Sequence, residues 1–76
     1  MKVVYLEWID AESVDAWEEY THADKEPPMI KTLGFLIRET KTYIVIALSI
    51  DETNGMCSSR IQIPTGMIIK RKLLKF

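Results

Sequence analysis

The sequence predicts a mainly β fold: a small, five-stranded, SH3-like, partly open barrel with one short helix in the long loop after the first strand. Segments rich in β-branched and aromatic residues recur along the chain, which is typical of strands. Short turn signals separate the later segments, as in an antiparallel meander. With 76 residues, we expect a single domain spanning 1–76, because this length allows only one core.

The first strand is expected over residues 2–9, KVVYLEWI, where both alternating sets of side chains are apolar. An acidic loop-helix insert follows over residues 10–28. Ser13 can cap a helix and Trp17 can anchor an apolar stripe at helical spacing, so the sequence predicts one or two helical turns. Two consecutive prolines, PP, then end the insert, because proline cannot donate a ladder hydrogen bond.

Four more strands are expected, at residues 30–39, 43–50, 57–63 and 67–74. The tight turn TKT joins the first two of these, and DETNG, with its Asn-Gly pair, predicts a hairpin before the third. Gly34 lies inside a strand pattern, which indicates a bend or bulge. The short break PTG precedes the last strand.

Five strands in one flat sheet would expose long edges in so small a domain, so we expect the sheet to curl. Curling into a partly closed barrel removes most of the exposed edge, and the bend at Gly34 would help it. We prefer an SH3-like barrel to an OB-type barrel because only a short turn separates the last two strands.

The net charge of −1 hides a division along the chain. Residues 7–26 carry eight acids and one base, a net charge of −7, whereas residues 57–76 carry five bases and no acid. Two such unlike regions can steer charged partners, can offset one another, or can favour head-to-tail self-association.

The composition also indicates the cellular compartment in which the protein is expected. The single cysteine, Cys57, excludes an internal disulfide and fits a reducing cytoplasm. No stretch approaches the ~20 apolar residues of a membrane span. We therefore expect an intracellular protein without membrane contact.

Three pieces of the chain resemble a set of short uncharacterised bacteriophage proteins: EWIDAESVDAWEEY, GFLIRETKTYIVIALSID and SSRIQIPTGMIIKRKLL. That set shares a W-x-D-A…W opening and an I-P-x-G-M-I-I-x-R close. The resemblance covers most of the chain, and its motifs are structural, without a catalytic signature. It implies a bacteriophage origin and a host-cytoplasm setting, in which proteins of this size usually act by binding.

No motif in the sequence indicates an enzyme, a metal site or a cofactor. His22 is the only histidine, and neither a cysteine nor a second histidine stands at metal-ligand spacing from it. Cys57 has no evident base, and the three glycines form no phosphate-binding loop. We expect no catalytic residues, no metal and no cofactor.

The acidic insert is the first candidate for recognition, because aromatic side chains among acids are common at binding hot spots. The alternative is that Trp17 caps an open end of the barrel while the acids are merely solvated. Under the first interpretation the acidic face that binds a partner consists of Asp15, Trp17, Glu18, Glu19 and Tyr20.

The basic end of the chain is the second candidate, for anions or nucleic acid. In a strand, Lys70 and Lys72 share one face and Arg71 the other, and lysines on an edge strand also prevent edge pairing. Nucleic acid is the less favoured partner, because the aromatic residues lie mostly among acids. The residues of this site are Arg60, Lys70, Arg71 and Lys72.

The sequence thus favours a phage-encoded, non-enzymatic binding protein that modulates or inhibits a host protein, such as a defence protein, through the acidic face. One alternative is an oligomer that sequesters a nucleotide-type host signal at Arg60, Lys70 and Arg71. The other is a weak nucleic-acid binder that uses the same basic strand.

Overall fold

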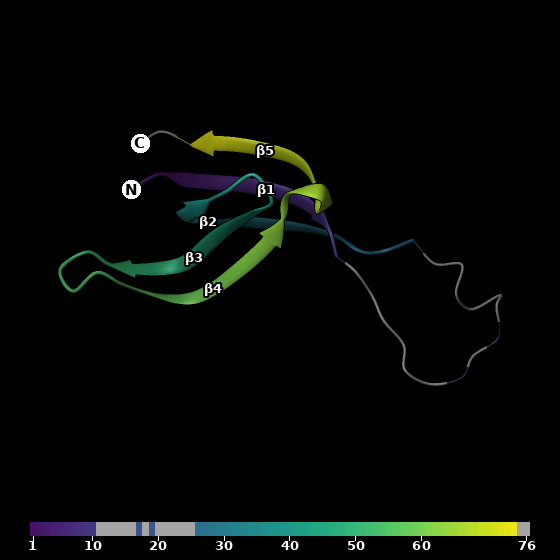
Figure 1. Cartoon of the computed structure of the whole chain (residues 1–76), viewed down its shortest axis with the longest axis horizontal. Helices are drawn as coiled ribbons and strands as arrows, with labels where there is room; N and C mark the ends of the chain where they lie inside the picture. Colours follow the sequence, from purple (N-terminus) through teal and green to yellow (C-terminus); the bar gives the residue numbers. More distant parts are fainter. Residues whose placement is uncertain (11–16, 18, 20–25, 75–76) are drawn as a thin grey trace.

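The computed structural model describes residues 1–10, 17, 19 and 26–74. These residues form five strands and one 3₁₀ turn, and they contain no α-helix. All five expected strands are confirmed to within one residue at either end. In chain order they are β1 (Val3–Ile9), β2 (Met29–Glu39), β3 (Tyr43–Asp51), β4 (Met56–Pro64) and β5 (Ile68–Leu74), with the 3₁₀ turn η2 (Thr65–Met67) before β5 (Figure 1).

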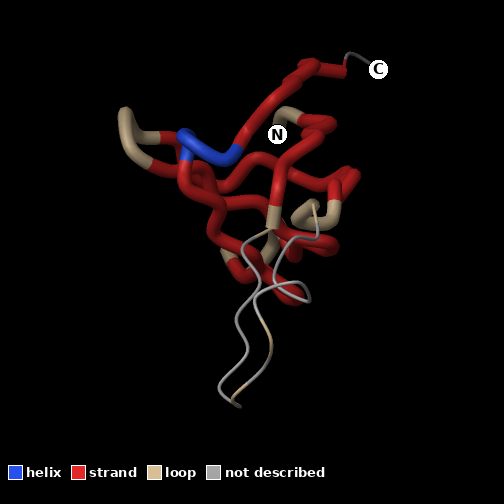
Figure 2. Tube along the Cα trace, turned by 90° about the vertical axis from the view of Figure 1, so that its right-hand side faces the viewer, coloured by secondary structure: helices blue, strands red, loops and turns tan. Residues whose placement is uncertain are grey.

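The strands form one antiparallel sheet in the order β4-β3-β2-β1-β5. The sheet is strongly curved (Figure 2) but is not closed into a barrel, because β4 and β5 are its two edges and do not pair with each other. The expectation that closure removes the edges was therefore wrong. Each edge carries its own protection instead: Ser59 in β4 has a φ of 55°, which interrupts a regular edge, and β5 carries three consecutive bases.

The turn η2 directs the chain from one edge of the sheet to the other. The Thr65 amide donates to the carbonyl oxygen of Thr42 at 2.9 Å, and the Thr65 hydroxyl donates to the carbonyl oxygen of Lys41 at 3.0 Å. Both acceptors lie in the turn between β2 and β3. The break PTG is therefore attached to that turn, and β5 leaves it to pair with β1.

The long strand β2 joins the two halves of the sheet. Its first half pairs with β1, its second half pairs with β3, and Phe35 lies opposite both Val3 and Ala47. The bend expected at Gly34 is placed slightly later, where the register with β3 shifts between Leu36 and Arg38. Glycine is needed at position 34 for a different reason: a Cβ there would lie 2.8 Å from the carbonyl oxygen of Ala47, so no larger residue fits.

The core lies on the concave side of the curved sheet, which we call the core face. Trp8 donates its indole N–H to the hydroxyl of Thr32 at 2.9 Å, so its buried polar atom has a partner. Residues from β1, β3 and β4 meet here because the curvature of β2 brings the two halves together. The cluster consists of Val4, Leu6, Trp8, Ile44, Ile46 and Ile63.

The hairpin signal DETNG is confirmed between β3 and β4. Gly55 adopts a φ of 64°, as the Asn-Gly pair predicts, whereas Asn54 does not have a positive φ. The Asp51 carboxylate accepts hydrogen bonds from the Thr53 and Asn54 amides and from the Asn54 side chain. The hydrogen bond from the Asn54 side chain is the main reason why the pKa of Asp51 is lowered.

The expected helix within insert 10–28 is not found among the described residues there, Asp10, Trp17, Glu19 and 26–28. A helix of one or two turns needs a packed apolar side, and Trp17, its expected anchor, is fully exposed. Residues 11–16, 18 and 20–25, with Ser13, lie outside the described part of the chain. The ends of the insert meet, because the Asp10 amide donates to the carbonyl oxygen of Pro28 at 3.1 Å.

Candidate functional site

The structure describes two of the five residues expected on the acidic face. Trp17 and Glu19 are both exposed, and the relative exposure of Trp17 is 104%. Trp17 therefore does not cap an open end of the sheet, and that interpretation was wrong. The other three expected residues, Asp15, Glu18 and Tyr20, lie outside the described residues, as does His22.

The bases of the alternative site do not form one cluster. Arg60 lies in β4 and Lys70, Arg71 and Lys72 lie in β5, at opposite edges of the sheet. In the register, Arg71 is opposite Leu6, a core residue, whereas Lys70 and Lys72 are opposite Glu7 and Tyr5 on the other face. The expected division of the β5 bases between two faces is confirmed.

Arg71 is neutralised by a partner from the other half of the sheet. Its guanidinium donates to the carboxylate of Glu39, at the end of β2, and the two residues are 32 positions apart in the chain. Hydrogen bonding to Arg71 lowers the pKa of Glu39, and the same bond raises the pKa of Arg71. Arg71 therefore already has a partner within the sheet, and a ligand would compete with Glu39 for its guanidinium.

The convex side of the sheet, which we call the outer face, gathers the remaining strand bases. The registers place the side chains there in rows that cross several strands. Lys70, Glu7 and Lys31 make one row, and Lys72, Tyr5 and Leu33 make the next. All the bases concerned are exposed: Lys31, Arg38, Arg60, Lys70 and Lys72, the outer-face bases.

Two half-buried aromatic side chains lie among these bases. Tyr5 in β1 is opposite Leu33, and Phe35 is two residues further along β2, so the two rings are diagonal neighbours on one face. The Tyr5 hydroxyl donates to the Glu7 carboxylate at 2.7 Å, and this bond raises the pKa of Tyr5. The ring of Tyr5 is thus held in place beside the bases.

Four residues of the outer face were not expected from the sequence: Tyr5, Lys31, Phe35 and Arg38. Tyr5 and Lys31 are far from the basic end of the chain, and only the pairing of β1 with both β2 and β5 brings them together. Alternation along the expected strand could have placed Lys31 on the face away from the core. The strand order was needed to show that Lys31 and the β5 lysines lie in rows across β1.

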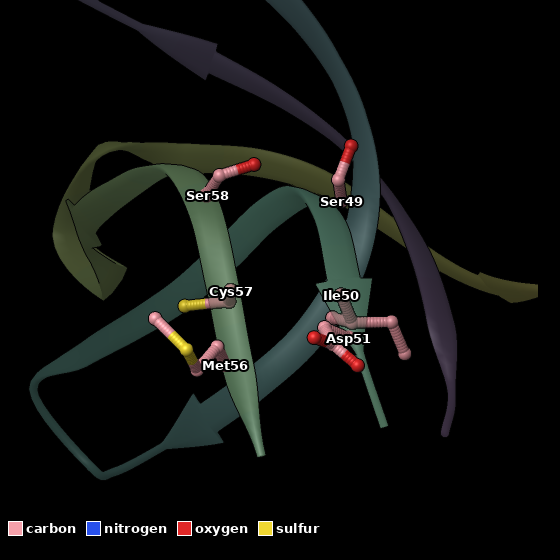
Figure 3. A pocket seen from close by; sticks show the side chains of 6 residues that line it. All are labelled: Ser49, Ile50, Asp51, Met56, Cys57 and Ser58. Carbon is pink, nitrogen blue, oxygen red and sulfur yellow. The ribbon is translucent and has the colours of Figure 1, made fainter. Parts of the chain in front are cut away.

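The tip of the β3–β4 hairpin contains a hollow of about 280 Å³ (Figure 3). Cys57 lines it and is an exposed free thiol. In Figure 3 the sulfur of Cys57 points toward the Met56 side chain and away from Asp51. Because the only carboxylate of the hollow, that of Asp51, is occupied by its own turn, the hollow contains no base for the thiol.

Among residues 1–10, 17, 19 and 26–74, no group of three or more potential ligands stands ready to hold a metal ion. The same residues include no helix long and apolar enough to span a membrane. No family model, no curated protein sequence and no solved structure matches this chain. The likeness to short bacteriophage proteins therefore rests on the sequence motifs alone.

Proposed function

We propose that this chain is a phage-encoded, non-enzymatic binding protein that acts on a host protein through its acidic segment, residues 10–26. The fully exposed Trp17 is the observation that carries the proposal. The other tryptophan, Trp8, is buried and hydrogen bonded, so the two tryptophans have different roles.

An exposed tryptophan offers a partner a large apolar surface to bury. Burial of a side chain of this size removes about 150–250 Å² from water. A tryptophan anchor typically contributes about 2 kcal/mol or more to an interface, which makes this residue type common at hot spots. Trp17 is therefore the side chain from which a partner gains the most.

The charge around Trp17 defines the chemistry of that partner. Residues 10–26 carry seven acids and one base, so the complementary surface is basic. Attraction between opposite charges accelerates encounter and selects among partners. The partner is accordingly a host protein with a basic patch that contains a pocket for an indole ring. Host defence proteins are among the candidates.

The same proposal includes an SH3-like architecture for the sheet. A strand order of β4-β3-β2-β1-β5, with a 3₁₀ turn before the last strand, supports an SH3-like architecture in which the edges remain apart. The long insert after β1 is then a binding loop carried by a rigid sheet, a common arrangement for recognition. The host cytoplasm is its proposed setting.

The alternative of a sequestered nucleotide-type signal has less support. Arg60 and Arg71 lie at opposite edges of the sheet, and Arg71 is paired with Glu39. Such a site would require a junction between copies of the chain and a break in that ion pair.

The test compares proteins captured from a bacterial lysate by the immobilised wild-type chain and by three variants. Trp17→Ala and the double variant Glu18→Lys with Glu19→Lys should each lose a basic protein that the wild type retains. The matched control is Glu52→Lys, which reverses an exposed acid in the β3–β4 loop. It should retain the same protein. If every variant captures the same set as the wild type, the acidic segment is not the contact surface.

A further inference from the structure

The outer face combines bases from three strands with two aromatic rings. We propose that this face binds single-stranded nucleic acid, with the outer-face bases on the phosphates and with Tyr5 and Phe35 stacking on unpaired nucleobases. The surface differs from the acidic segment and does not depend on the function proposed for that segment.

Charge is the first argument for a polyanionic occupant. The outer face carries five exposed bases, and the acids that alternate onto it among the described strand residues are Glu7 and Asp51. Both acids already accept hydrogen bonds within the chain, from Tyr5 and from the hairpin turn. Among the described residues the single salt bridge is that of Arg71, on the core face, so it uses none of the outer-face bases.

The aromatic rings distinguish a nucleic acid from a simple anion. Tyr5 and Phe35 occupy diagonal positions on neighbouring strands, about 7 Å apart, and both residues are half-buried. Stacked bases of a single strand match such a platform because every base has an aromatic face. The exposed Leu33 beside Tyr5 extends the apolar surface. A duplex hides its base faces, so the single strand is the better occupant.

Glu7 allows a test by gain of affinity, because it is an acid among the outer-face bases. Its carboxylate lies in the row between Lys31 and Lys70, where it opposes a phosphate. Glu7→Gln removes that negative charge and leaves an oxygen that can still accept from Tyr5. This variant should bind nucleic acid more tightly than the wild type.

The experiment measures the anisotropy of a labelled oligothymidylate of about 12 nucleotides, a length within the range that one small β domain covers. Titrations at several salt concentrations should give a linear fall of log K with log salt, with a slope of roughly −0.7 for each phosphate contacted. Lys31→Ala with Lys72→Ala should reduce that slope by roughly 1.4. Lys41→Ala, a matched control in the β2–β3 turn, should match the wild type.

Stacking is tested at Tyr5. Tyr5→Ala should weaken binding roughly five- to hundredfold, which corresponds to the typical stacking contribution of one base, and Tyr5→Phe should retain the affinity. Tyr5→Leu, which preserves apolar volume, covers the case in which the alanine variant fails to fold. Trp17→Ala should leave oligonucleotide binding unchanged, and Lys31→Ala with Lys72→Ala should leave protein capture unchanged, so the two proposals can fail separately.

Four results would overturn the proposal. The first is that the chain does not bind oligothymidylate at low salt. The second is that Lys41→Ala loses as much affinity as an alanine variant of an outer-face lysine. The third is wild-type affinity in both Tyr5→Ala and Tyr5→Leu, which would leave a charge effect alone. The last is tighter binding of a duplex of the same length than of the single strand.

Discussion

The backbone of β3 passes so close to Gly34 that a Cβ there would lie 2.8 Å from the carbonyl oxygen of Ala47. This contact occurs where β2 leaves β1 and joins β3. Real Cβ atoms do not approach a backbone oxygen so closely, so any larger residue must push β2 and β3 apart. The two halves of the sheet share one core, and the separation would disturb it.

Gly34→Ala is therefore expected to destabilise the fold. Overpacking of a well-filled site usually costs about 1–3 kcal/mol, and the neighbour here is backbone, which cannot rotate away. Urea denaturation followed by circular dichroism measures the change. Gly66→Ala is the control, because nothing lies within 4 Å of its added Cβ. It should match the wild type or gain up to ~1 kcal/mol. Equal midpoints for Gly34→Ala and the wild type would contradict the close approach.

The hydrogen bond between Trp8 and Thr32 is expected to stabilise the core. Thr32→Val leaves the buried indole N–H without an acceptor, which should cost about 1–3 kcal/mol in the free energy of unfolding. Thr32→Ser preserves the hydroxyl and should lose much less. Urea denaturation followed by tryptophan emission gives both values. A valine variant as stable as the wild type would contradict a stabilising role of this hydrogen bond.

The ion pair of Arg71 and Glu39 should make a small, pH-dependent contribution to stability. The folded pKa of Glu39 lies below its ordinary value of 4.5, so the contribution is complete above that pH and is lost as the pH falls through the folded pKa. Both side chains are about 40% exposed, which limits the contribution to about 0.2–1 kcal/mol. The difference in unfolding free energy between the wild type and Glu39→Gln should shrink in acid. A difference that stays constant as the pH falls would show that the ion pair makes no pH-dependent contribution to stability.

The different environments of the two tryptophans should be visible in acrylamide quenching. Trp17 is fully exposed and Trp8 is 7% exposed, so the wild type should contain one readily quenched and one protected fluorophore. Trp17→Phe should abolish the quenched component and leave a blue-shifted emission from Trp8. If the emission that remains in Trp17→Phe is still readily quenched, the assignment of the two environments is wrong.

The extent of each strand could be predicted from the sequence because local patterns determine it. Alternation, β-branched residues and the turns TKT and DETNG placed all five strands to within one residue. The curvature was also anticipated from Gly34, although the register shift came later, between Leu36 and Arg38. The close approach of the β3 backbone to Gly34 involves Ala47, and the sequence around Gly34 does not reveal that contact.

The arrangement of the edges and of the outer face depends on long-range pairing, and it could not be predicted. The ion pair of Arg71 with Glu39 joins strands that are not neighbours in the sheet, and it removed Arg71 from the expected basic site. Conversely, the pairing of β1 with β2 and β5 brought Tyr5 beside Lys31 and Lys72. Clusters of this kind follow from strand order, which the sequence suggested only through the analogy with an SH3-like barrel.

The most direct test of the central claim is the affinity of the captured host protein for the wild-type chain and for Trp17→Ala, measured by calorimetry with the purified partner. Loss of an anchor tryptophan should cost about 2 kcal/mol or more, which is roughly a thirtyfold rise in Kd, while Glu52→Lys leaves Kd unchanged. Equal Kd values for the wild type and Trp17→Ala would contradict the claim that the exposed indole is the contact by which this protein holds its partner.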